Sequence, residues 1–180
     1  MKKQINSLIK ICMLSLIPIS AVGQATGSRN ITITLPKVAL LDVEPAGTVV
    51  MDFLAPTEAG RPLVAPAVNN SKWINYTSAL ATADPSRSIT AAINQTIPGL
   101  DLRLQAAAAS GSGGGTRGTA GGQVVLTTVP TTIISGIRGA FTGTGANNGH
   151  RLTLSIRTNN YANLTAGNNN TLVITYTIIE

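Results

Sequence analysis

The sequence predicts an all-β protein, an antiparallel β-sandwich of about nine short strands. Segments of alternating apolar and polar residues recur at intervals of roughly 10 to 20 residues, separated by clusters of glycine, proline or asparagine. Their apolar positions are mainly isoleucine, valine and leucine, with many threonines between, a composition favoured in strands. No window keeps a helical period long enough to form a stable helix.

The N-terminal segment, residues 1–23, has the three parts of a secretory signal peptide. Lysines precede an apolar run at residues 11–19, and Ala21 and Gly23 place small residues before a cleavage site. The run is too short for a membrane-spanning helix, which needs about 20 apolar residues. We therefore expect an exported chain, residues 24–180, that forms one domain without a membrane span, in the periplasm, at the cell surface or outside the cell.

The exported chain has a small net charge and no cysteine. Three of the 13 lysines and arginines lie in the leader, which holds none of the seven acidic residues, so the formal net charge falls from +6 to +3. The remaining basic residues are scattered, which argues against a nucleic-acid partner. Cys12 is the only cysteine and lies in the leader, so disulfides and thiolate metal sites are excluded and the domain depends on packing.

The first half of the chain contains a series of predicted strands. They cover residues 31–35, 38–43, 48–54, 72–77 and 88–93, and a proline-rich surface crossing separates the third from the fourth. In the fourth, alternation places Trp73 on one face and Tyr76 on the other. We expect Trp73, Tyr76 and Phe53 to anchor the core, because a buried aromatic side chain removes about 150–250 Å² from water.

The second half continues the pattern. Predicted strands cover residues 100–104, 124–128, 131–134, 151–156 and 171–179. In the last of them, one face carries Leu172, Ile174, Tyr176 and Ile178. The alanine run at residues 106–109 is too short to sustain a helix beside glycine. Residues 110–122, rich in glycine, serine and threonine, are expected to form a Gly-rich loop.

Three motifs could in principle belong to a catalytic or binding site, but each is better explained as a structural feature. The G-x-G-x-x-G match at residues 113–118 lacks the strand-to-helix context of a dinucleotide site. His150, the only histidine, has neither a G-x-S-x-G serine nor a partner histidine, and its Asn/Gly neighbours predict a solvated turn. Asp42 and Glu44 share one strand face, whereas a glycosidase sets two acids across a cleft. We therefore expect no catalytic, metal or cofactor site.

Several segments together resemble a known family. They are residues 30–35 leading into 38–43, the late segment 147–154, and the closing strand 172–178. With the leader, these segments are similar to secreted bacterial pilin-like β-sandwich proteins, in particular fimbrial subunits and spore-coat-U-type domains assembled by chaperone and usher. The resemblance implies an immunoglobulin-like fold and a periplasmic chaperone as a partner.

The resemblance also implies strand donation, in which an N-terminal extension completes the incomplete fold of the next subunit. Carried over to this sequence, it makes Ile31, Ile33 and Leu35 the residues that enter a neighbour's groove. A donated strand gains main-chain hydrogen bonds, while its alternate side chains fill pockets that fix the register. The alternative is that residues 31–35 pair within their own domain, with Pro36 marking a turn.

We expect a secreted, non-enzymatic structural or adhesive protein, a fimbrial subunit that associates with copies of itself or with other envelope subunits. The alternative is a secreted carbohydrate-binding β-sandwich module. Its stacking platforms would be Trp73, Tyr76 and Tyr161, because an aromatic face packs well against a sugar ring.

Overall fold

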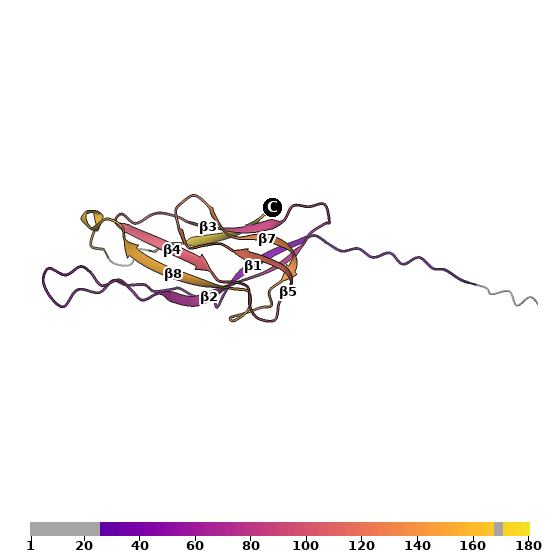
Figure 1. Cartoon of the computed structure of the whole chain (residues 1–180), viewed down its shortest axis with the longest axis horizontal. Helices are drawn as coiled ribbons and strands as arrows, with labels where there is room; N and C mark the ends of the chain where they lie inside the picture. Colours follow the sequence, from indigo (N-terminus) through magenta and orange to yellow (C-terminus); the bar gives the residue numbers. More distant parts are fainter. Residues whose placement is uncertain (1–25, 168–170) are drawn as a thin grey trace, which may run out of the picture. The chain divides into compact units, whose positions relative to one another are not determined.

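The computed structural model describes residues 26–167 and 171–180, so the predicted leader lies outside the described residues. The chain divides into two units, and the strands all belong to the second, Leu35–Glu180 (Figure 1). In sequence order these strands are β1 (Val38–Glu44), β2 (Asn69–Ala79), β3 (Arg87–Ile93), β4 (Leu100–Ala106), β5 (Gly114–Ala120), β6 (Val124–Val125), β7 (Thr131–Phe141), β8 (His150–Thr158) and β9 (Ile174–Ile179). The described residues contain no α-helix, only the short 3₁₀-helix η1 (Tyr161–Asn163).

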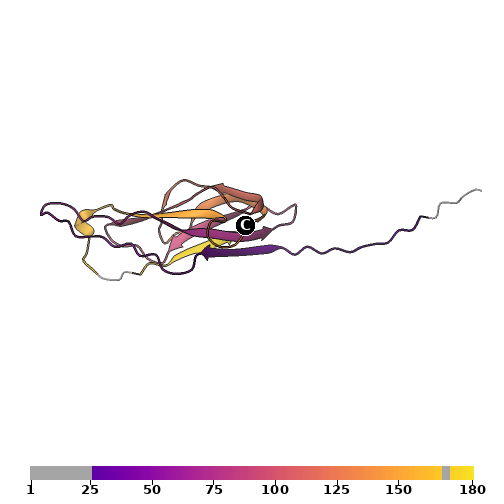
Figure 2. The ribbon, with the colours of Figure 1, turned by 90° about the horizontal axis from the view of Figure 1, so that it is seen from below.

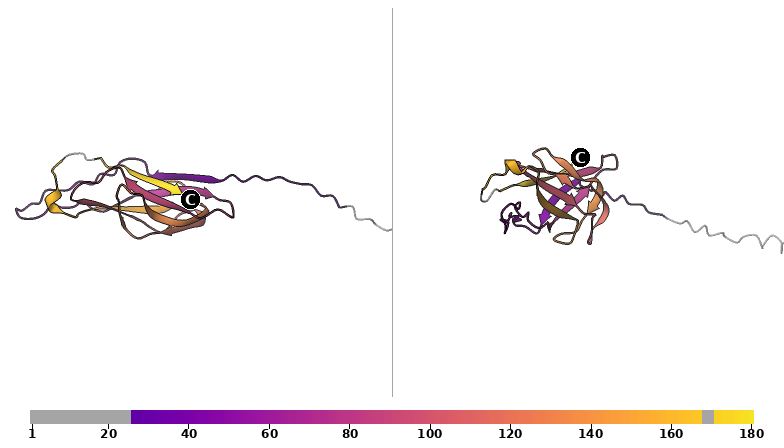
Figure 3. Two further views of the ribbon diagram at one scale, coloured as in Figure 1. Left: turned by 90° about the horizontal axis from the view of Figure 1, so that it is seen from above. Right: turned by 60° about the vertical axis from the view of Figure 1, so that its left-hand side comes forward.

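The strand ladders are antiparallel and form one sheet that folds over into two layers (Figures 1 and 3). One layer has the order β1-β2-β8-β4-β6, and the other has the order β9-β3-β7-β5. The two layers join where Thr77 and Ser78 of β2 pair with Phe141 and Ala140 of β7. This arrangement confirms the predicted all-β, sandwich-like fold.

The core lies between the two layers and follows the alternation of the strands. Its members are apolar side chains that each face inward from a strand or from the segment after β6: Ile74, Tyr76, Ile89, Ala91, Ile93, Leu104, Ala106, Leu126, Ile133, Ile134, Ile137, Ala140, Leu152 and Leu154. Since the period of a strand is two residues, alternate positions supply much of this core, while Asn75 and Thr90, which lie between core residues, are also buried. The predicted alternation in the last strand is also observed, because Ile174, Tyr176 and Ile178 pack against this core while their neighbours are exposed.

Two of the predicted strands do not form ladders. Residues 31–35 have an extended backbone but belong to no strand of the described structure. Residues 48–54 alternate as predicted, with Val49 and Met51 packed against the core, yet their only ladder contact is the isolated bridge between Leu54 and Val64. Alternation reports which side chains are buried, whereas a strand also needs a neighbouring backbone to pair with.

The predicted Gly-rich loop at residues 110–122 is wrong, because its centre is strand β5, paired with β7. Glycine is required at this position. Gly115 has a φ of 78°, and a Cβ atom there would lie 2.1 Å from the carbonyl oxygen of Gly139. The ladder also shifts register between Gly115 and Arg117, as at a β-bulge. Glycine-rich composition therefore marks a close approach of two backbones here rather than an unpaired loop.

The substitution Gly115→Ala is expected to destabilise the domain by about 2–4 kcal/mol, because it adds left-handed strain to a backbone clash. Gly122→Ala is the matched control, since a Cβ atom at Gly122 meets nothing within 4 Å. Urea unfolding of both variants measures the difference. Equal stabilities for the two variants would mean that β5 does not lie against β7 in this register.

Candidate functional site

The edges of β1 and β9 that face one another have no strand partner in the described part of the chain. β1 pairs with β2 alone, and β9 pairs with β3 alone. The two strands nevertheless lie side by side and point in opposite directions (Figures 2 and 3). We call these facing, unpaired edges of Val38–Glu44 and Ile174–Ile179 the β1–β9 seam.

The seam runs directly over the core. Leu41 and Val43 of β1 and Ile174, Tyr176 and Ile178 of β9 are partly buried and pack against the core cluster. Burial raises the pKa of Tyr176, so its phenol stays neutral at physiological pH. An unpaired strand edge leaves backbone donors and acceptors open to another chain. The seam therefore combines open backbone groups with partly covered apolar side chains.

The predicted donor residues are strongly exposed. Ile31, Ile33 and Leu35 are 83%, 77% and 86% exposed. Three exposed apolar side chains at alternate positions place apolar surface along one face of an extended segment. Their alternation matches the period of a strand, although no ladder in the described structure includes them.

The three predicted stacking residues do not form one platform. Tyr76 is only 3% exposed, so its proposed role as a sugar platform is wrong, while its role as a core anchor is confirmed. Trp73 and Phe53 are partly exposed and lie outside the core cluster, which corrects their prediction as core anchors. Tyr161, in η1, is 53% exposed and its hydroxyl accepts a hydrogen bond from the Leu63 N–H, 3.4 Å away.

His150 is wholly buried at the start of β8, so the predicted solvated turn is wrong. Its ring stacks on Tyr76 with centroids 5.8 Å apart and an angle of 19° between the planes. Nδ1 lies 2.8 Å from the Ala107 carbonyl oxygen, which can only accept, so Nδ1 carries the proton. Nε2 lies 3.1 Å from the Tyr76 hydroxyl and 3.2 Å from the Arg117 carbonyl oxygen, to which that hydroxyl donates.

The surroundings of His150 favour its neutral form. Burial lowers its pKa, hydrogen bonds to the Ala107 and Arg117 carbonyls oppose that shift, and the positive charge of Arg117 adds to it. Burial also raises the pKa of Tyr76 to about 12, so Tyr76 remains a neutral donor. This group of side chains is a buried polar cluster that joins β2, β5 and β8.

This cluster predicts a loss of stability in mild acid. The folded-state pKa of His150 lies below the unfolded value near 6.5, so the unfolded chain takes up the proton first as the pH falls. The free energy of unfolding should therefore fall as the pH drops below about 6.5, by at most about 1.4 kcal/mol per pH unit. Urea titrations between pH 7.5 and 5 measure the slope. Since His150 is the only histidine, His150→Gln should flatten it, and an unchanged slope would contradict the assignment.

The other residues considered for catalysis or metal binding do not come together in one site. Asp42 and Glu44 lie on β1 opposite Asn75 and Trp73, not opposite another acid. Within residues 26–167 and 171–180, no group of three or more potential metal ligands gathers. A small apolar pocket is lined by Ile93, Thr96, Ile97, Leu100, Leu102, Leu126, Ile156 and Leu172. Its lining contains no ionisable group.

No described helix is long and apolar enough to span a membrane. Comparison of the chain with protein families, with curated proteins and with solved structures gives no match.

Proposed function

We propose that this chain is a non-enzymatic structural or adhesive protein that associates by strand addition at the β1–β9 seam. The proposal follows from the two unpaired edges that face one another over the core. A strand placed between them gains main-chain hydrogen bonds on both sides, and its inward side chains cover apolar surface. Because β1 and β9 point in opposite directions, such a strand runs antiparallel to one of them and parallel to the other.

The incoming strand in this proposal is residues 31–35 of another copy. Its alternation places Ile31, Ile33 and Leu35 on one face, where they would meet Ile174, Tyr176 and Ile178 of the acceptor. The intervening Thr32 and Thr34 would face water. This pattern matches the requirement for a strand with one buried face. Association of this kind accounts for three exposed apolar residues that would otherwise oppose solubility.

A peptide competition experiment tests this function. The chain beginning at Gln24 is mixed with a synthetic peptide of residues 30–36, and self-association is followed by sedimentation velocity. We expect the peptide to bind and to suppress association, while a peptide of the same composition in scrambled order has no effect. A chain that self-associates equally well with both peptides would exclude donation by this segment.

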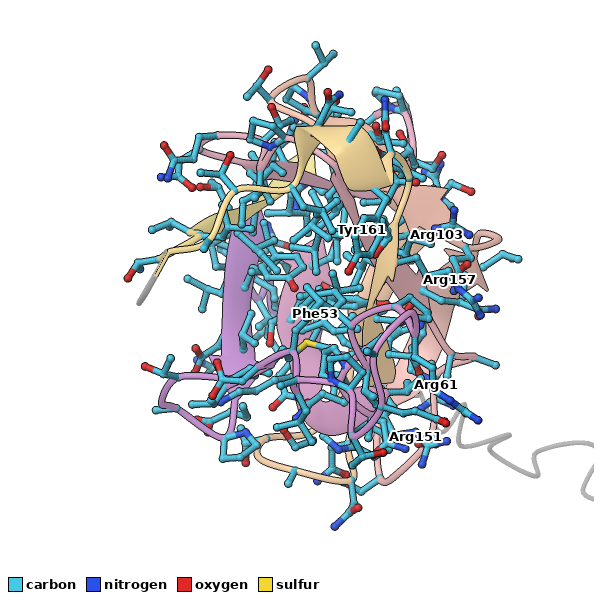
Figure 4. The ribbon with its side chains drawn as sticks, turned by 90° about the vertical axis from the view of Figure 1, so that its left-hand side faces the viewer. Phe53, Arg61, Arg103, Arg151, Arg157 and Tyr161 are labelled. Carbon is cyan, nitrogen blue, oxygen red and sulfur yellow. The ribbon has the colours of Figure 1, made fainter. Side chains whose placement is uncertain are left out.

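The carbohydrate-binding alternative has one supporting observation, at the end of the domain that carries η1. Figure 4 shows Tyr161 and Phe53 at this end, with Arg61 and Arg157 on its flank. Exposed aromatic and arginine side chains suit sugar stacking and bidentate binding of carboxylates. Loss of glycan-array signal in Tyr161→Ala, with unfolding unchanged, would favour this function. Absence of signal for the parent chain would exclude it.

A further inference from the structure

One end of the β1–β9 seam is closed by a single buried side chain, that of Arg87. This arginine is the first residue of β3 and is 5% exposed. One guanidinium nitrogen, Nη1, donates to the Val38 carbonyl oxygen and to the Ser78 hydroxyl, the latter at 3.3 Å. Nε and Nη2 donate to one carboxylate oxygen of Glu180, at 3.2 and 2.6 Å. Arg87 therefore ties the start of β1 to the residue that follows β9.

The contacts of Arg87 are stronger than those along the rest of the seam. Hydrogen bonds from a guanidinium to a carboxylate are charge-assisted, and the cation is almost wholly buried. Removing its partner would leave a desolvated charge, which is costly. Between β1 and β9 themselves there is no ladder in the described structure. The seam is thus fastened at Val38 and Glu180, whereas no ladder hydrogen bond joins β1 to β9 toward Glu44 and Ile174 in the described residues.

We propose that Arg87 acts as a stop for the incoming strand, so that the strand enters from the open end of the seam and halts in one register. This inference rests on the proposed function. Register matters because a slip of one residue turns the whole apolar face of a strand outward. A slip of two residues keeps the faces but misplaces every side chain along the acceptor. Alternation of apolar and polar residues does not prevent a slip of two residues. The contacts of Arg87 at one end of the seam do, because they stop the strand at a fixed position.

Disulfide mapping between copies reads this register directly. One protein carries Thr32→Cys, and a second carries Thr175→Cys, Thr177→Cys or Ile179→Cys, the positions that face outward on β9. Cross-strand neighbours on one face come close enough for a disulfide, whereas positions two residues away are less favourable. Each pair is mixed as the chain from Gln24, which contains no other cysteine, and oxidised mildly.

In the parent background we expect one of the three pairs to dominate. Glu180→Gln removes the charge that Arg87 binds, and Arg87→Lys keeps a cation but loses the forked geometry. Either change in the acceptor should raise the minor pairs by about tenfold relative to the dominant pair, as expected for a lost hydrogen bond to a charged group. Arg138→Gln is the control, because that partly exposed guanidinium bonds only to the Thr82 carbonyl oxygen among the described residues.

Urea unfolding of each acceptor confirms that it is folded, and Glu180→Gln keeps the experiment decisive if Arg87→Lys fails to fold. An unchanged pattern of disulfides in Glu180→Gln would overturn the role of Arg87 while leaving strand addition intact. If the parent chain forms none of the three pairs, the proposed function fails, and this inference fails with it.

Discussion

Replacing Ile31, Ile33 and Leu35 together with serine is expected to abolish self-association of the exported chain. Each of these side chains, when buried in a partner, contributes about 1.5–3 kcal/mol. Losing all three should therefore weaken association by roughly a thousandfold or more. Sedimentation velocity over a range of concentrations measures the effect. The folded unit should keep its stability, because the three side chains are exposed and contribute no burial to it.

The control variant replaces three other exposed apolar residues, Val50, Leu54 and Val129, with serine. They are 73%, 64% and 67% exposed, so the loss of apolar surface is comparable. Non-specific association through exposed apolar groups would weaken in both variants alike. A comparable loss in the control would therefore contradict a specific role for residues 31–35.

His150→Ala is expected to destabilise the fold by about 3–5 kcal/mol. The change removes a buried ring that stacks on Tyr76 and leaves the Ala107 carbonyl oxygen without the N–H that Nδ1 donates to it. A buried acceptor without a donor costs free energy in addition to the cavity. Chemical denaturation by urea measures the change.

Arg157→Ala, on the same strand, is the matched control for His150→Ala. Its side chain is exposed and makes no hydrogen bond within the described residues, so the expected change is within about 0.5 kcal/mol. Similar losses in both variants would mean that the polar cluster around His150 contributes little to the stability of the fold.

The fold class could be predicted because alternation is a local property of the chain. Residues 72–77 and 151–156 both lie within observed strands, since each buries one face against the core. Residues 48–54 show the limit of this reasoning. They alternate and bury Val49 and Met51, but the sequence does not reveal whether a neighbouring backbone exists to complete the ladder.

The functional features, too, could be predicted only where they depend on a local pattern in the sequence. The exposed alternating residues Ile31, Ile33 and Leu35 could be proposed from the sequence, because their pattern lies within one short segment. The seam could not, because it depends on which edges of β1 and β9 remain unpaired after distant strands have assembled. The prediction for His150 is wrong for a related reason. Its Asn/Gly neighbours form a turn, but the strand begins at His150 itself and turns the ring inward.

Hydrogen exchange at the seam is the most direct test of strand addition. Backbone amides of β1 and β9 are compared between the assembled chain and the serine variant of residues 31, 33 and 35, which should remain monomeric. If a strand from another copy fills the seam, amides of both strands should become strongly protected in the assembled chain, because their unpaired N–H groups acquire acceptors. Protection that is the same in the two samples along β1 and β9 would contradict the central claim.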